Sequence, residues 1–81
     1  MNRPTAFVMV NAEIGEEEEV LRFLKEEIKV DEAYVVYGVY DLVARVSADT
    51  MKNLKDMVIN QIRQAKGVRS TLTMVIVREW S

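Results

Sequence analysis

The order of strand-like and helix-like segments is the feature that most restricts how this chain can fold. Four short runs rich in β-branched and other apolar residues are interrupted by two longer stretches with helical periodicity, one after the first run and one after the third. The strand-like runs occupy residues 5–11, 32–38, 41–47 and 70–79. The order β-α-β-β-α-β predicts a ferredoxin-like α+β fold, because right-handed crossovers place both helices on one face of a four-stranded antiparallel sheet.

Both helical stretches carry a single apolar stripe. The stripes comprise Val20, Leu24 and Ile28 in the first stretch and Leu54, Val58 and Ile62 in the second. The acidic residues 16–19 suit the first turn of a helix, where they complement the positive end of its dipole, and we do not interpret them as a metal site. Asp49 or Thr50 is expected to cap the second helix, and Gly67 is expected to end it.

The strands carry apolar side chains on both faces, although two helices can cover only one face of the sheet. In the first strand Phe7 and Met9 point away from Val8 and Val10, and the last strand alternates in the same way. Hydrophobic residues make up 49% of the 81-residue chain, more than a small monomer readily buries. We therefore expect a second copy to pack sheet to sheet, as in dimeric α+β barrels.

Charge and residue usage restrict the possible functions. We expect a single domain over residues 1–81, and its net charge of −2 argues against direct binding to nucleic acid. The chain has no cysteine and no histidine, which removes disulfides, thiolate metal sites and the commonest general base. We predict no metal and no cofactor. The apolar run at 6–10 is too short for a membrane span or a signal peptide, so we expect a cytoplasmic protein.

The first candidate binding site lies between the second and third strands, at Gly38, Val39, Tyr40 and Asp41. Glycine permits a positive φ, which would turn the chain sharply and aim successive N–H groups outward to hold a carboxylate. Asp41 can accept a hydrogen bond from an ammonium group. Together these groups match the zwitterion of an α-amino acid. The alternative is an ordinary turn in which Asp41 caps its own backbone.

The second candidate is a group of hydroxyls at the start of the last strand: Ser70, Thr71 and Thr73. These groups can donate to the carboxylate of a ligand. Threonine is also a common strand residue that forms cross-strand pairs, so both interpretations stay open.

The stretches AYVVYGVYDLVARV and VRSTLTMVIV resemble the effector-binding domain of the Lrp/AsnC family of feast/famine transcription regulators, known as the RAM domain. The resemblance covers essentially the whole chain. Its most specific parts are Gly-x-Tyr-Asp at 38–41 and Val-x-Ser/Thr-x-x-Thr at 68–73. It implies sheet-to-sheet dimers, their assembly into octamer-like rings, and amino-acid effectors bound between dimers. It also implies effector contacts from Gly38, Val39, Tyr40, Asp41, Ser70, Thr71 and Thr73.

The function that this resemblance implies is amino-acid sensing and oligomerisation in transcription regulation, without enzymatic activity. Family members carry a helix-turn-helix domain that this sequence lacks, so we expect a stand-alone form that modulates full-length Lrp/AsnC paralogues and does not bind DNA itself. The stretch VDEA at 30–33 lacks the glycine that the family often has there. Two alternatives are a small dimeric α+β barrel enzyme, of the monooxygenase or isomerase type, and a purely structural assembly module.

Overall fold

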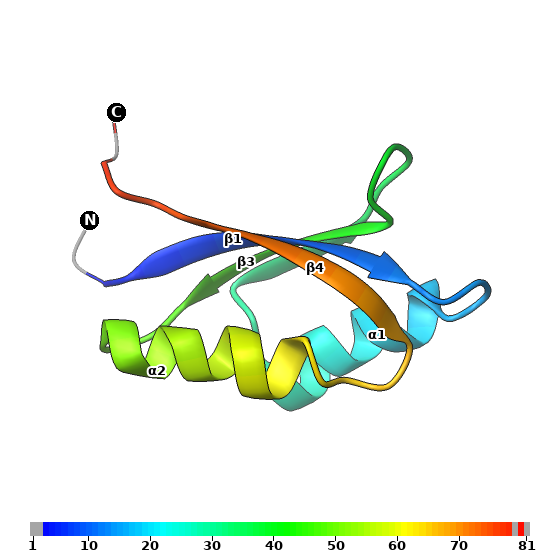
Figure 1. Cartoon of the computed structure of the whole chain (residues 1–81), viewed down its shortest axis with the longest axis horizontal. Helices are drawn as coiled ribbons and strands as arrows, with labels where there is room; N and C mark the ends of the chain where they lie inside the picture. Colours follow the sequence, from blue (N-terminus) through cyan, green and yellow to red (C-terminus); the bar gives the residue numbers. More distant parts are fainter. Residues whose placement is uncertain (1–2, 79, 81) are drawn as a thin grey trace.

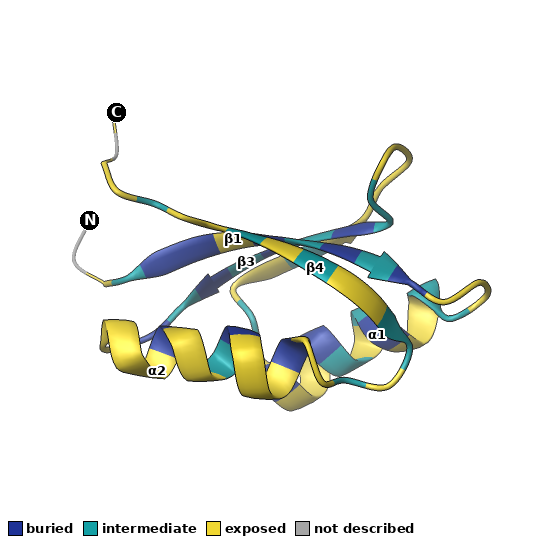
Figure 2. Cartoon of the chain, viewed as in Figure 1, coloured by how far each residue is buried: buried dark blue, intermediate teal, exposed yellow. Residues whose placement is uncertain are grey.

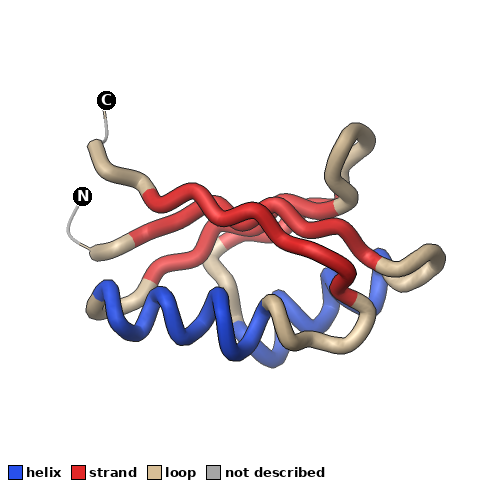
Figure 3. The backbone as a smooth tube through the Cα atoms, in the orientation of Figure 1, coloured by secondary structure: helices blue, strands red, loops and turns tan. Residues whose placement is uncertain are grey.

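The computed structural model describes residues 3–78 and Trp80, and it consists of a four-stranded sheet with both helices packed against one face (Figures 1 and 3). The elements are β1 (Thr5–Ala12), α1 (Glu17–Phe23), η1 (Leu24–Ile28), β2 (Glu32–Val35), β3 (Leu42–Ser47), α2 (Met51–Asp56), η2 (Met57–Ile62) and β4 (Val68–Val75). The strand order is β2-β3-β1-β4, and all neighbouring strands are antiparallel. This topology confirms the predicted ferredoxin-like α+β fold.

Each of the two helices begins as an α-helix and continues as a π-helical segment, η1 or η2. The two predicted stripes are buried against the sheet. Thr50, rather than Asp49, caps the second helix, because its hydroxyl accepts a hydrogen bond of 3.0 Å from the backbone N–H of Asn53.

Several elements end at positions that differ from the prediction. β2 ends at Val35 rather than at residue 38, because this edge strand pairs only with β3 and the chain then leaves the sheet. β4 covers Val68–Val75, so it starts and ends earlier than the predicted 70–79, of which Glu79 lies outside the described residues. Its early start follows a shift of register at Asn11/Ala12. The second helix ends at Ile62, so Gly67 does not cap it but lies in the link before β4, with a φ of +90°.

The core lies between the sheet and the helices (Figure 2). Alternate residues of β1 and β3 point into it, and they are completely inaccessible to solvent: Ala6, Val8, Val10, Leu42, Ala44 and Val46. The helices contribute their apolar stripes from the other side, while most of their remaining residues are exposed. The strict alternation along the two central strands fixes which face of the sheet the helices cover.

The opposite face of the sheet, here called the outer face, carries no helix (Figure 1). The registers of β1, β3 and β4 place Phe7 opposite Met74, and Met9 between Val43 and Leu72. Tyr34 of β2 joins them as the partner of Val43. Phe7, Tyr34, Leu72 and Met74 are each between 37% and 55% exposed, so the chain leaves a continuous apolar surface open to solvent.

The glycine at 67 gives a direct test of how the link before β4 packs against the start of the first helix. A Cβ at Gly67 would lie 3.1 Å from Val20 Cγ2 and 3.3 Å from Glu16 Cβ, and the φ of +90° is unfavourable for any L side chain. We therefore expect Gly67→Ala to lower the free energy of unfolding by about 1–3 kcal/mol in urea denaturation. Gly38→Ala is the control, since a Cβ there meets nothing within 4 Å. Equal stability of the two variants would contradict the packing described here.

Candidate functional site

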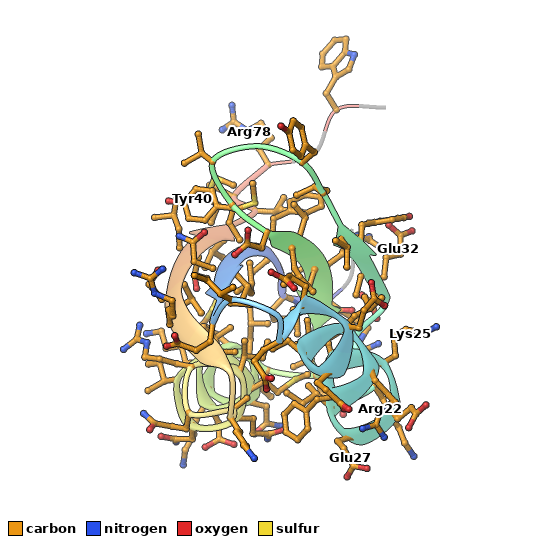
Figure 4. All side chains as sticks on the ribbon, turned by 90° about the vertical axis from the view of Figure 1, so that its right-hand side faces the viewer. Arg22, Lys25, Glu27, Glu32, Tyr40 and Arg78 are labelled. Carbon is orange, nitrogen blue, oxygen red and sulfur yellow. The ribbon has the colours of Figure 1, made fainter. Side chains whose placement is uncertain are left out.

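The loop that joins β2 to β3, Val36–Asp41, projects from the sheet on the side of the outer face (Figure 1, upper right). A hydrogen bond of 2.8 Å from the N–H of Val36 to the carbonyl of Asp41 closes its base. The side chains of Tyr37 and Val39 are almost fully exposed at its tip, whereas Tyr40 is partly buried. Figure 4 views the molecule from the loop end, and there Tyr40 lies on the opposite side from Glu32 of β2.

The prediction that Gly38 adopts a positive φ is wrong. Within the described chain, the glycines with positive φ are Gly15 and Gly67. The connection between the paired residues Val35 and Leu42 is long enough to reverse the chain gradually, so the tight turn that would need a left-handed residue does not form. A different feature makes the loop available to a ligand. The N–H groups of Gly38, Val39 and Tyr40 donate to no other group of residues 3–78 and Trp80.

Asp41 fastens the loop to the end of β1. Its N–H donates to the carbonyl of Val10 at 2.9 Å, and its carboxylate oxygen Oδ2 accepts from the N–H of Ala12 at 2.8 Å. This charge-assisted hydrogen bond lies on the edge of β1 that faces β3, just beyond the point where the pairing of these strands stops at Val10 and Leu42. The side chain thus caps the backbone of the neighbouring strand rather than its own. It stays partly exposed, and its other carboxylate oxygen accepts no hydrogen bond from any residue that the structure describes.

The hydroxyls of β4 divide between the two faces of the sheet. Ser70 pairs with Asn11 on the outer face, where the Asn11 side-chain amide donates to the Ser70 hydroxyl at 3.3 Å. Thr71 pairs with Val10, so it lies across β1 from Asp41 but points toward the helices. Thr73 pairs with Val8, farther from the loop, and lies beside the second helix. Within one chain, Ser70 and Thr71 therefore lie at the same end of β1 as Asp41, whereas Thr73 lies farther along the strand.

Asn11 is a polar residue at this end of the sheet that sequence reasoning missed. It follows the apolar run of β1 directly, and its amide lies on the outer face between β3, which follows Asp41, and β4, which carries Ser70. The sequence did carry a signal for this residue: Asn11 is a polar side chain at the end of an otherwise apolar strand.

A charged surface that includes Arg22, Lys25 and Glu27 follows the first helix, on the helical side of the molecule (Figure 4). A hollow of about 630 Å³ lies there, with Glu16, Glu19, Arg22 and Glu26 among its lining residues. The hydrogen bond from Arg22 to Glu19 raises the pKa of the Arg22 guanidinium. Among the described residues, no group of three His, Cys, Asp or Glu side chains is placed to hold a metal ion. No helix in the same part of the chain has the length and apolar character needed to cross a membrane.

Comparison with known proteins identifies close structural relatives. A family model described as the Lrp/AsnC ligand binding domain matches residues 5–81. The solved structure of FFRP-DM1 is 39% identical, with a TM-score of 0.87 and a match that covers 91% of this chain and 99% of that one. A hypothetical protein, PHS023 from Pyrococcus horikoshii, is 39% identical with a TM-score of 0.85, and the match covers 94% of this chain and 92% of that one.

A more distant relative is a feast or famine regulatory protein from M. tuberculosis, solved in complex with L-methionine. It is 23% identical with a TM-score of 0.77, and the match covers 96% of this chain and 52% of that protein. At this identity the similarity is one of fold. No curated protein matches the chain.

The hydrogen bond between Asp41 and Ala12 predicts a measurable contribution to stability. We expect Asp41→Ala to lower the free energy of unfolding by about 1–2 kcal/mol, because the Ala12 N–H loses its acceptor. Asp41→Asn keeps an acceptor oxygen and should cost less than about 1 kcal/mol. Urea denaturation of both variants makes the comparison, and a loss of stability in Asp41→Asn as large as in Asp41→Ala would contradict the geometry.

Proposed function

Since the chain belongs to the Lrp/AsnC ligand-binding domain family, we propose that it binds an amino acid or a similar small zwitterion and couples that binding to its own assembly. The observation that carries the proposal is the carboxylate of Asp41. It is held at the end of β1 by one oxygen, while the other oxygen is available beside a loop with unused N–H donors.

The proposed site has separate places for the two charges of the ligand. The free oxygen of Asp41 accepts from the ammonium group. The N–H groups of Gly38, Val39 and Tyr40, with the Ser70 hydroxyl at the neighbouring strand end, are the candidate donors to the carboxylate. Thr71 and Thr73 point to the helical side of the sheet, and we propose at most an indirect role for them within one chain.

The class of ligand is supported by the family. The M. tuberculosis relative was solved with L-methionine, and this chain spans about half of that protein. That relative is described as a regulatory protein, and for this reason we propose a regulatory role rather than an enzymatic one. By extension, we propose that the chain modulates full-length regulators of the same family and does not contact nucleic acid itself.

We propose that ligand binding is coupled to assembly, because the loop and the outer face lie on the same side of the sheet (Figure 1). Two copies packed through their outer faces would bury the apolar surface around Met9 and Leu72 and bring their loops to the edge of the interface. Higher assembly, such as an octamer-like ring, would then place a ligand in contact with more than one copy. A ligand that contacts two copies stabilises the assembly by its binding free energy.

Titration calorimetry with the twenty amino acids tests the proposed ligand site. At least one should bind with a Kd between about 1 μM and 1 mM, as befits a ligand of about ten heavy atoms. Asp41→Asn keeps the bond to Ala12 but loses the charge, so it should weaken binding at least about tenfold. Asp49→Asn, an exposed acid that pairs with Arg3, is the matched control and should bind normally. If none of the twenty amino acids binds at millimolar concentration, or if Asp41→Asn binds normally, the proposed site is refuted.

Light scattering tests the proposed interface. Leu72 lies on the outer face beside Met9 of the central strand, so Leu72→Glu should lower the mass of the assembly to that of a single chain, because the charge would be buried unpaired. Ile14→Glu is the control, since Ile14 is 94% exposed in the link that follows β1. A native protein that is monomeric at micromolar concentration, or a Leu72→Glu variant that still assembles, would count against this interface.

A further inference from the structure

A second recess is lined by residues of the second helix and of β4. These two elements lie side by side away from the β2–β3 loop (Figure 1). Its volume is about 140 Å³. The surface is mainly apolar: Leu54 and Val58 form the helical side of its floor, Ile59 extends that wall outward, and Val75 lines the strand side. A volume below the roughly 300–1,000 Å³ of drug-sized pockets suits only a small ligand.

Two cationic side chains accompany this apolar surface. Lys55 and Arg63 line the recess from the same helical edge as Ile59, at a spacing of four residues on either side of it. Neither has an ion-pair partner among residues 3–78 and Trp80, whereas other arginines of the chain do. The residues that line the recess include no carboxylate. The recess therefore offers positive charge to an anion but no counter-charge to an ammonium group.

Thr73 supplies a polar atom that lacks a partner. Its hydroxyl is buried and makes no hydrogen bond within the described chain, although the residue lines the recess. A buried hydroxyl without a partner is destabilising. Rotation about the Cα–Cβ bond can turn this hydroxyl toward the recess, where an anionic oxygen would accept its hydrogen bond.

We propose that this recess binds a short branched aliphatic monocarboxylate. The apolar floor takes the branched tail, the carboxylate accepts from Lys55 or Arg63, and Thr73 donates to the same group. The absence of a lining acid makes the recess select against zwitterionic amino acids of the same shape. The proposal is therefore independent of the effector site at Asp41 and can hold or fail separately from it.

The test uses 3-methylbutanoate as the probe, with NMR chemical shifts of the labelled full chain as the readout. We expect saturable shifts at Ile59, Val58 and Thr73, with a Kd in the millimolar range for so small a ligand. The uncharged isostere 3-methylbutanamide, and valine, should each bind about fivefold more weakly or worse. Equal binding of the amide, shifts centred elsewhere, or no saturation by about 20 mM probe would overturn the proposal.

Variants separate the roles of the lining residues. Thr73→Val keeps the shape of the side chain, and we expect it to raise the Tm of the unliganded protein while it weakens the probe about fivefold. The double variant Lys55→Gln with Arg63→Gln should weaken the probe about tenfold, whereas Lys52→Gln, on the same helix but outside the recess, should not change it. Unchanged affinity in both Thr73→Val and the double variant would overturn the proposal.

Discussion

The alternation of side chains along β1 and β3 is the constraint on which the rest of this structure depends. It directs six small and branched side chains into a dry layer against two helices, and a slip of register by one residue would expose all of them. The same alternation presents the other set, with Phe7, Met9 and Val43, on a face without helices. A single pattern thus produces both the core of one chain and the surface through which we propose that two chains associate.

The position of the β2–β3 loop is also a consequence of this pairing. Leu42 is opposite Val10, and the preceding residue, Asp41, therefore reaches the backbone just beyond the paired part of β1. Its carboxylate accepts a hydrogen bond from the N–H of Ala12 just beyond the point where β1 and β3 stop pairing, which fastens the base of the loop to the central strand. A loop supported in this way can expose free N–H groups while its base stays fixed to the sheet.

Sequence patterns predicted the fold because each element carries its own period: the stripes ending at Ile28 and Ile62 have helical spacing, and the strands alternate. They also identified Asp41 as a candidate residue, but not its hydrogen bond to Ala12, since that contact depends on the register between β1 and β3, which are distant in the sequence. The conformation of Gly38 was wrongly predicted, because loop length and not composition decides it. Likewise, three hydroxyls close in sequence proved to face two sides of the sheet, which only the pairing of β4 determines.

The place of β1 between β3 and β4 also governs how the chain can acquire its structure. Its pairing with β4 joins Ala6 to Val75, segments near opposite ends of the chain. During synthesis, β1 and β3 can form their antiparallel pair, with the first helix between them in the chain, long before β4 has left the ribosome. Until then one edge of the central strand is bare, and its hydrogen-bonding groups are open to other chains. Such non-local pairing also slows the final step of folding. The rate at which β4 docks therefore sets how long each new molecule is vulnerable to aggregation.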